Sequence, residues 1–203
     1  MAKKSTYNAK DIEVLEGLEP VRKRPGMYIG STNQDGLHHL VNEVLDNSID
    51  EVLAGHATDI SFQYKKDGSI KIKDNGRGIP IDFHPKYKNK RALEVVLTTL
   101  HAGGKFNSNA YKTSGGLHGV GISVVNALSS LLQVQVFKDG KVYRQDYSKG
   151  KVKTKIKIEK CSKKLKGTEI SFIPDESIFE ETQFVQKKLY NFCLIYTTPS
   201  PRD

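Results

Sequence analysis

The sequence has little cysteine, and its 203 residues include only two. Cys161 and Cys193 stand apart, without the C-x-x-C spacing of a zinc site or a redox motif, so neither kind of site is expected. An apolar leader is also missing, and so is any hydrophobic run of membrane-spanning length. We therefore expect a protein of the reducing cytoplasm with no membrane role.

Acidic side chains are in the minority: 23 aspartates and glutamates stand against 32 lysines and arginines, for a net charge of +9. Much of the excess lies between Lys149 and Lys166, where lysine alternates with residues such as Val152 and Ile156. Clustered lysine is typical of a DNA-contacting surface. It is equally typical of an exposed strand that resists edge pairing. The sequence leaves both interpretations open.

The pattern of apolar residues predicts one α+β domain over residues 21–192, preceded by an arm and a first short helix over 1–20. The short helix is expected over 11–18 and ends near the segment Arg22–Gly26. We expect longer helices over 37–53, 91–101 and 120–129. Strands are expected over 59–64, 69–73, 133–138, 141–147, 152–158 and 168–173. This order predicts a two-layer sandwich, with helices packed on one mainly antiparallel, mixed sheet.

Neither of the commonest nucleotide-binding loops is present. Lys105 is followed by Phe106 instead of the serine or threonine of a Walker A loop, and the glycines of 115–121 run G-x-x-G-x-G instead of G-x-G-x-x-G. Two glycine clusters, 103–104 and 115–121, nevertheless flank a polar stretch and precede an apolar helix. Glycine allows backbone N–H groups to close around phosphates at a helix N-terminus. The pattern favours a phosphate-binding lid over a flexible linker, which would have serine-rich flanks.

The helix expected over 37–53 has a polar stripe opposite an apolar side. The stripe consists of His39, Glu43, Asp46, Asn47, Asp50 and Glu51. The apolar side consists of Leu37, Val41, Val44, Leu45 and Val52. An acidic stripe on an amphipathic helix usually faces water, but Asn47 and Ser48 are short oxygen ligands suited to Mg²⁺. Under that second interpretation Glu43 is a candidate general base, and His39, one turn earlier, orients its carboxylate.

The segment Asp74–Pro80 follows a strand directly and contains two glycines. Asp74, at the end of the strand, can accept a hydrogen bond from an exocyclic amine and so could read adenine. The alternative is an ordinary turn aspartate.

Four motifs in one order resemble the ATPase domain of type IIA topoisomerase B subunits: Glu43–Glu51, Asp74–Gly78, His101–Phe106 and Ser114–Gly121. The opening segment Arg22–Gly30 is similar to the same family, and the likeness runs from about residue 7 to residue 190. The first two motifs are shared more loosely with heat-shock-90 chaperones, mismatch-repair ATPases and sensor histidine kinases. The resemblance implies the Bergerat, or GHKL, ATPase fold.

The resemblance also implies roles for individual residues. Glu43 would activate the hydrolytic water with support from His39, Asn47 would hold Mg²⁺, Asp74 would bind the adenine amine with help from Thr168, and Glu51 would pair with Arg77. The implied nucleotide-binding residues are Tyr7, Asn47, Asp50, Asp74, Arg77, Gly78, Ile79, Pro80, Lys105, Tyr111, Gly116, Leu117, His118, Gly119, Val120, Gly121, Ile122 and Thr168.

The resemblance further implies an ATP- and Mg²⁺-dependent gate that drives DNA strand passage. The gate would form a homodimer through the N-terminal arm, with Tyr7 reaching the partner's nucleotide, and would act with a DNA-cleaving A subunit in a heterotetramer at the nucleoid. Residues 9–20 and 174–179 look more like topoisomerase IV, which decatenates and relaxes DNA, than like gyrase, which supercoils it. The alternatives are a gyrase B subunit and a chaperone-like or mismatch-repair-like clamp without strand passage.

The sequence departs from the family's pattern in several ways. Asn75 stands where many relatives have a second aspartate, and Lys138 stands where gyrase relatives often have an arginine. The family's transducer and cleavage domains are not part of the sequence, so we expect the chain to bind ATP and hydrolyse it poorly. Residues 193–203 fit no continuation of the family and resemble read-through of a sequencing adapter, so we expect a non-native tail there.

Overall fold

A computed structural model describes residues 15–102 and 121–197 of the chain. The helices are α1 (Glu19–Lys23), α2 (Gly26–Ile29), α3 (Gln34–Leu53), α4 (Ala92–Thr98), α5 (Gly121–Ala127) and α6 (Gln186–Thr197). The strands are β1 (Ile60–Tyr64), β2 (Ile70–Asp74), β3 (Ser129–Lys138), β4 (Lys141–Ser148), β5 (Lys151–Val152), β6 (Lys157–Lys160) and β7 (Gly167–Pro174). Among these described helices, none combines the length and apolar character that crossing a membrane requires.

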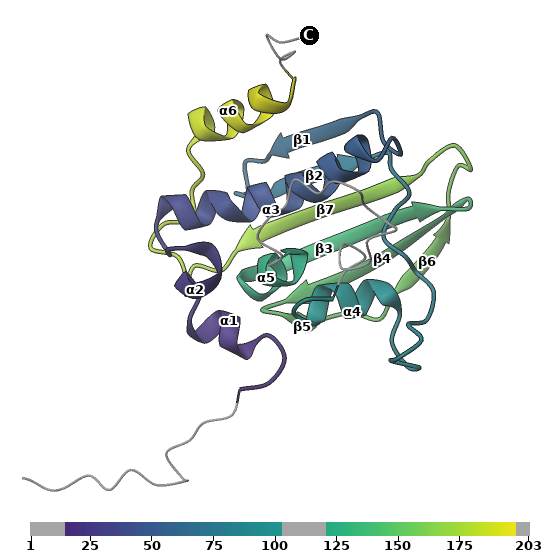
Figure 1. Cartoon of the computed structure of the whole chain (residues 1–203), viewed down its shortest axis with the longest axis horizontal. Coiled ribbons are helices and arrows are strands. Elements are labelled where there is room, and N and C mark those ends of the chain that lie inside the picture. The colour runs from purple at the N-terminus through teal and green to yellow at the C-terminus, as the bar shows by residue number, and fades with distance from the viewer. Residues whose placement is uncertain (1–14, 103–120, 198–203) are drawn as a thin grey trace, which may run out of the picture.

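The strands form one sheet in the order β1-β2-β7-β3-β4-β5, and β6 pairs with β4 beside β5. Every pairing in the described strands is antiparallel, so the mixed sheet that we expected has no parallel pair there. The late strand β7 inserts between β2 and β3, which brings the end of β2 beside the start of β7. Figure 1 shows α3, α4 and α5 lying across one face of this sheet.

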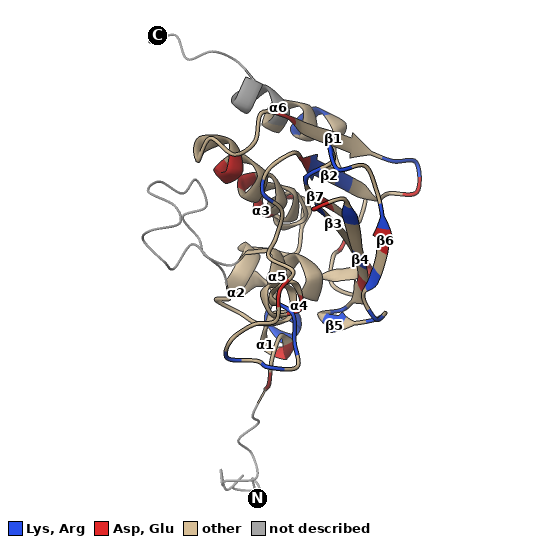
Figure 2. Ribbon diagram, turned by 90° about the vertical axis from the view of Figure 1, so that its right-hand side faces the viewer, with Lys and Arg blue, Asp and Glu red and all other residues tan. Residues whose placement is uncertain are grey.

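Apolar rows that cross the sheet form the floor of the core. Ile72 pairs with Ile170, which pairs with Val134, and Phe172 pairs with both Ile70 and Leu132 in the next row. All six side chains are at least 95 % buried, because the helix layer covers them. The opposite face carries polar residues such as Lys71, and Figure 2 shows it free of α3, α4 and α5. This alternation is typical of an antiparallel sheet with one solvated face.

Several expected boundaries are wrong. No helix covers 15–18, and α1 begins at Glu19 because Pro20 lies in its first turn, where proline is tolerated best. The second long helix ends at Thr98, since Thr99 is extended and His101 adopts a positive φ of 55°. The strand expected over 152–158 is split into β5 and β6.

The interruption between β5 and β6 has a local cause. The N–H groups of Lys153 and Thr154 both donate to the Asp146 carbonyl oxygen, at 2.8 and 3.2 Å, which takes both residues out of the ladder. At the other end of the chain, α6 runs to Thr197 and passes the domain end expected at residue 192.

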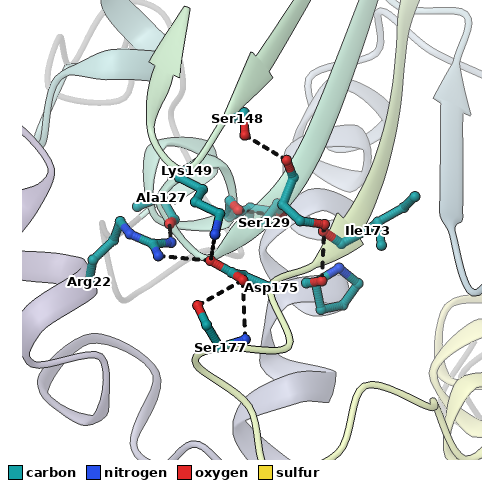
Figure 3. A network of polar contacts seen from close by, with 11 residues as sticks. Arg22, Ala127, Ser129, Ser148, Lys149, Ile173, Asp175 and Ser177 are labelled. Carbon is teal, nitrogen blue, oxygen red and sulfur yellow. Dashed lines mark hydrogen bonds and ion pairs between the residues drawn. The ribbon is translucent and has the colours of Figure 1, made fainter. Parts of the chain in front are cut away.

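A polar network joins α1 to the end of α5 and to the segment after β7 (Figure 3). Arg22 Nη2 lies 2.8 Å from Asp175 Oδ2, and Arg22 Nη1 donates to the Ala127 carbonyl oxygen. Lys149 Nζ is 3.4 Å from Asp175 Oδ2, while Ser177 donates to Asp175 Oδ1 from both its N–H and its hydroxyl. Burial raises the pKa of Asp175, but the Ser177 hydrogen bonds and Arg22 outweigh it and hold the pKa at about 2.

We expect Asp175→Asn to lower the free energy of unfolding at pH 7 by about 2 kcal/mol, because Arg22 loses its carboxylate. A depressed folded-state pKa stabilises the fold above the unfolded pKa near 4, and that stabilisation disappears as the pH falls toward 2. Urea denaturation across this range should therefore show the two proteins converging in acid. The exposed neighbour Glu176→Gln is the control. A constant difference down to pH 2 would contradict this origin of the stabilisation.

Candidate nucleotide-binding site

The helix α3 brings the polar stripe into the interior of the domain. The Asn33 side chain caps its start by accepting a hydrogen bond from the Asp35 N–H. Glu43 is 8 % exposed and Asp50 1 %, so the interpretation of this stripe as a water-facing surface is wrong at both positions. Val52, expected in the core, is 39 % exposed, because the last turn of α3 is not covered.

The Glu43 carboxylate is held from two sides. His39 Nε2 lies 3.2 Å from Oε1, and the Gly121 N–H, the first of α5, donates to Oε2 at 3.0 Å. The hydrogen bond to Glu43 raises the pKa of His39; burial opposes this, and the negative charges of Glu43 and Asp46 support it. The buried carboxylate is therefore oriented at the point where the chain enters α5 from residues 103–120.

Asn47 is placed one turn after Glu43 on the same stripe. Its Nδ2 donates to the Glu43 carbonyl oxygen at 2.7 Å, which fixes the amide and directs Oδ1 away from that bond. An oriented amide oxygen is a suitable ligand for Mg²⁺. The described residues contain no group of three or more histidine, cysteine, aspartate or glutamate side chains that could hold a metal ion. Since Mg²⁺ commonly binds one or two protein ligands together with phosphates, Asn47 fits such a role.

Asp74 is buried where the end of β2 meets β7 and α3. Its Oδ1 accepts from the N–H groups of Gly76 and Thr168, at 2.8 and 3.3 Å, and Oδ2 accepts from the Ser48 hydroxyl at 3.3 Å. Burial raises the pKa of Asp74, these hydrogen bonds lower it, and the charge of Glu51 raises it. The bond from Gly76, two residues later, is the one that a turn aspartate makes, but Asp74 is 7 % exposed and is also contacted from β7 and α3, so its surroundings extend beyond the turn.

Glycines allow the backbone to close around Asp74. A Cβ at Gly167, which has φ +106°, would lie 2.1 Å from the Asp74 carbonyl oxygen. A Cβ at Gly76 would lie 2.8 Å from Glu51 Oε2, and one at Gly78 would lie 2.9 Å from a Val136 methyl carbon. Glycine is required at position 167, where a Cβ would meet the backbone of Asp74 and Asn75, and it is favoured at position 78, where φ is +76°; at position 76 the nearest atom is the end of the Glu51 side chain.

Glu51 joins the end of α3 to the loop after β2. Its Oε1 lies 2.7 Å from Arg77 Nη2, and its Oε2 accepts from Arg77 Nε at 3.2 Å and from the Arg77 N–H at 2.9 Å. The pairing expected between these two residues is confirmed, and it takes the two-point form for which arginine is suited. It holds the segment that contains Gly78, Ile79 and Pro80 against α3.

Asn75 uses its amide in a way that an aspartate could not. Its Oδ1 accepts from the N–H groups of Thr58 and Asp59, at 2.8 and 3.1 Å. Its Nδ2 donates to Thr58 Oγ1 at 2.9 Å and to Asp59 Oδ2 at 2.8 Å. Asparagine at position 75, where many relatives have aspartate, therefore suits the neighbouring Asp59 carboxylate, to which its amide donates.

We expect Asn75→Asp to lower the free energy of unfolding by about 1–2 kcal/mol at pH 7, because it replaces a donor beside Asp59 with a second carboxylate. The loss should shrink below about pH 4, where carboxylates protonate. Urea denaturation at pH 7 and pH 4 tests this, with Asp59→Asn/Asn75→Asp as the variant that restores a carboxylate–amide pair. Equal stability of parent and single variant at pH 7 would contradict the explanation.

The fold brings together most of the expected site residues that it describes. Glu43, His39 and Asn47 lie along one stripe of α3, and Thr168 Oγ1 accepts from the Ile79 N–H at 3.2 Å. The Ile122 side chain belongs to the core, so its backbone alone could face a ligand. The expected residues outside the described ranges are Tyr7, Lys105, Tyr111, Gly116, Leu117, His118, Gly119 and Val120.

Two neighbours of Asp74 were not predicted from the sequence. Ser48 supplies the hydroxyl to its carboxyl, and Gly167 lies against its backbone. Glycine directly before an apolar strand was the available signal for Gly167. For Ser48 the signal was a small polar residue on the buried side of α3.

The family described as histidine kinase-, DNA gyrase B- and HSP90-like ATPase matches residues 32–178. The B subunit of DNA topoisomerase 4 from Rickettsia bellii is 63 % identical over 190 residues, which are 93 % of this chain and 29 % of that protein. The B subunit of DNA gyrase from Thermotoga maritima is 58 % identical over 178 residues, which are 88 % of this chain and 28 % of that protein. The chain thus spans less than a third of the length of these relatives.

Solved structures give the same assignment. The topoisomerase IV ATP-binding domain of Francisella tularensis, in complex with a small-molecule inhibitor, is 40 % identical with a TM-score of 0.76, over 90 % of this chain and 85 % of that one. The 43K ATPase domain of Thermus thermophilus gyrase B, in complex with an aminocoumarin, is 43 % identical with a TM-score of 0.75, over 86 % and 43 %. The chain therefore belongs to the histidine kinase-, DNA gyrase B- and HSP90-like ATPases, and it is similar to the ATPase domains of topoisomerase IV and gyrase B subunits.

Proposed function

We propose that the chain is the ATP-binding and ATP-hydrolysing gate of a bacterial type IIA topoisomerase. The observation that carries the proposal is the buried Asp74 carboxyl, oriented by Gly76, Thr168 and Ser48 beside the helix that carries Glu43. A buried carboxylate with this support is suited to accept a hydrogen bond from the adenine amine. The similarity to the B subunits of topoisomerase 4 and gyrase supports the same function.

In this proposal α3 carries the chemistry of hydrolysis. Glu43 accepts a proton from the water that attacks the γ-phosphate, and His39 keeps the carboxylate in position. Carboxylate oxygens have several lone-pair sites, so the bond from the Gly121 N–H leaves room for a water. Mg²⁺, held by Asn47 and the phosphates, would neutralise charge on the phosphates. Backbone N–H groups of 116–122 and Lys105 would contact the phosphates.

The larger assembly follows from the same proposal. ATP that binds a site completed by a second copy of the chain favours the dimer, because the closed state has the higher affinity for nucleotide. The N-terminal arm of each copy would reach the other copy, so that its Tyr7 contacts the partner's nucleotide. A DNA-cleaving A subunit would complete a heterotetramer at the nucleoid, and passage of duplex DNA would decatenate or relax it, as in topoisomerase IV.

Calorimetric titration with a non-hydrolysable ATP analogue and Mg²⁺ tests the proposal, and sedimentation reports the oligomeric state. We expect one nucleotide per chain and a shift from monomer toward dimer when nucleotide is added. GTP analogue is the control, because its purine presents a carbonyl where adenine presents an amine. Equal binding of both nucleotides, or no binding of either, would refute the adenine site.

A further inference from the structure

A lysine-rich segment lies at the edge of the sheet opposite β1. Residues 149–166, here called the lysine strip, contain nine lysines and one acidic residue, Glu159. All nine lysines are exposed. Among the described residues, Lys149 alone of the nine has a carboxylate partner, Asp175, and Lys166 donates to a backbone carbonyl oxygen. The strip is therefore a concentration of cations that the described part of the fold does not neutralise.

The strip is extended and runs along one edge of the sheet. Its two strands, β5 and β6, both pair with β4, at opposite ends of that strand. Figure 2 shows Lys and Arg on β5 and β6 at this margin of the molecule. Lys151 is opposite Ser148 and Lys160 is opposite Lys141, so the strip spans seven residue steps of β4, or about 23 Å at about 3.3 Å per residue. One strand of duplex DNA carries a phosphate about every 3.4 Å along its axis, so the strip can follow several phosphates in a row.

The strip also brings like charges together in the ladder. Lys157 is directly opposite Arg144, and Lys160 is directly opposite Lys141, which in turn pairs with Lys138. Directly opposed like charges destabilise a sheet. Lysine on an edge strand resists edge pairing, but that role does not require a lysine directly opposite another cation. The repulsion between these opposed cations would be relieved if an anionic partner covered the strip.

The composition of the strip indicates which anion it fits. Residues 149–166 contain no aromatic side chain, so they offer no stacking platform for the bases of a single strand. They contain no arginine either, and arginine is the usual residue for reading guanine by a two-point contact. Lysines at regular spacing are suited to neutralise a backbone without reading its sequence.

We propose that the lysine strip binds the phosphate backbone of duplex DNA. The proposal deepens the function proposed above, because it names the surface on which the gate domain holds DNA, but it requires no nucleotide. A groove of about 650 Å³ at the start of the strip, lined in part by Arg22, Lys23, Lys149 and Lys151, continues the basic surface toward α1.

Fluorescence anisotropy of the 203-residue chain with a labelled duplex of about 30 base pairs, without nucleotide, tests the proposal. The strip variant replaces Lys151, Lys153, Lys155 and Lys157 with glutamine. The control variant makes the same charge change at four exposed lysines outside the strip: Lys65, Lys66, Lys88 and Lys187. All eight side chains are exposed, so both variants should keep the fold, which circular dichroism verifies.

We expect the strip variant to lose at least about tenfold in affinity at about 50 mM salt, whereas the control loses less than about threefold. The slope of log affinity against log salt should fall by about 0.9 for each phosphate contact removed, in the strip variant only. Equal losses of DNA affinity in the two variants would show that only the net charge of the chain matters, and this would overturn the proposal. So would tighter binding of single-stranded DNA, or competition by polyglutamate as effective as by duplex. Nucleotide binding is measured separately, so failure here leaves the ATP site standing.

Discussion

Asp74→Asn is expected to lower affinity for a non-hydrolysable ATP analogue by about 100-fold, or ~3 kcal/mol, while the fold survives. Asparagine can keep Oδ1 as the acceptor for Gly76 and Thr168, and the Ser48 hydroxyl can rotate to accept from the new amide. The amide would then present N–H to the adenine amine, so two donors would face each other. Calorimetric titration measures the loss.

Stability should not fall with affinity in this variant. Burial and the charge of Glu51 raise the pKa of Asp74, so a neutral amide removes an unfavourable charge from this buried position. Asp139→Asn is the control, because Asp139 is exposed in a turn with φ 53°, which asparagine tolerates. Parental nucleotide affinity in Asp74→Asn, with the fold intact, would remove Asp74 from the adenine site.

The second large effect is expected for Glu43→Gln, which should reduce ATP hydrolysis by at least about 100-fold and change nucleotide affinity by less than about threefold. Glutamine can still accept from the Gly121 N–H, so the start of α5 keeps its contact. Its amide cannot take a proton from water. A single-turnover assay measures the small rate that we expect of this chain, and titration measures the affinity.

Asp46→Asn is the matched control for Glu43→Gln, since it removes one carboxylate from the same stripe of α3 without a proposed role in proton transfer. We expect hydrolysis within about threefold of the parent in this control. The pair of variants also separates an ATP-hydrolysing gate from a clamp that uses nucleotide only for conformation. Unchanged ATP turnover in Glu43→Gln would exclude Glu43 as the general base and would favour the clamp interpretation.

The helices and strands with a clear period were predictable from the sequence. The helix expected over 37–53 is α3, which starts three residues earlier, because its apolar positions repeat every three to four residues. The hairpin around Asp67 and Gly68 was predictable from alternation and turn residues, and β1 and β2 match it closely. The pairing of Glu51 with Arg77 followed from the family resemblance, and the structure confirms it.

Contacts between distant segments were not predictable in this way. The insertion of β7 between β2 and β3 places Thr168 and Gly167 against Asp74, and no local pattern encodes that pairing. The amide of Asn75 is explained only by Asp59, which the β1–β2 pairing brings beside it. The break between β5 and β6 depends on the Asp146 carbonyl oxygen, so an alternating pattern alone predicted one long strand.

The position at which the purine of ATP binds tests the proposed function most directly. A crystal structure of the chain with a non-hydrolysable ATP analogue and Mg²⁺ would locate it. We predict the adenine amine within hydrogen-bonding distance of an Asp74 carboxyl oxygen, with Asn47 Oδ1 on the metal and Glu43 facing the γ-phosphate. Nucleotide bound instead in the basic groove near Arg22 and Lys149, without contact to Asp74, would contradict the proposed function.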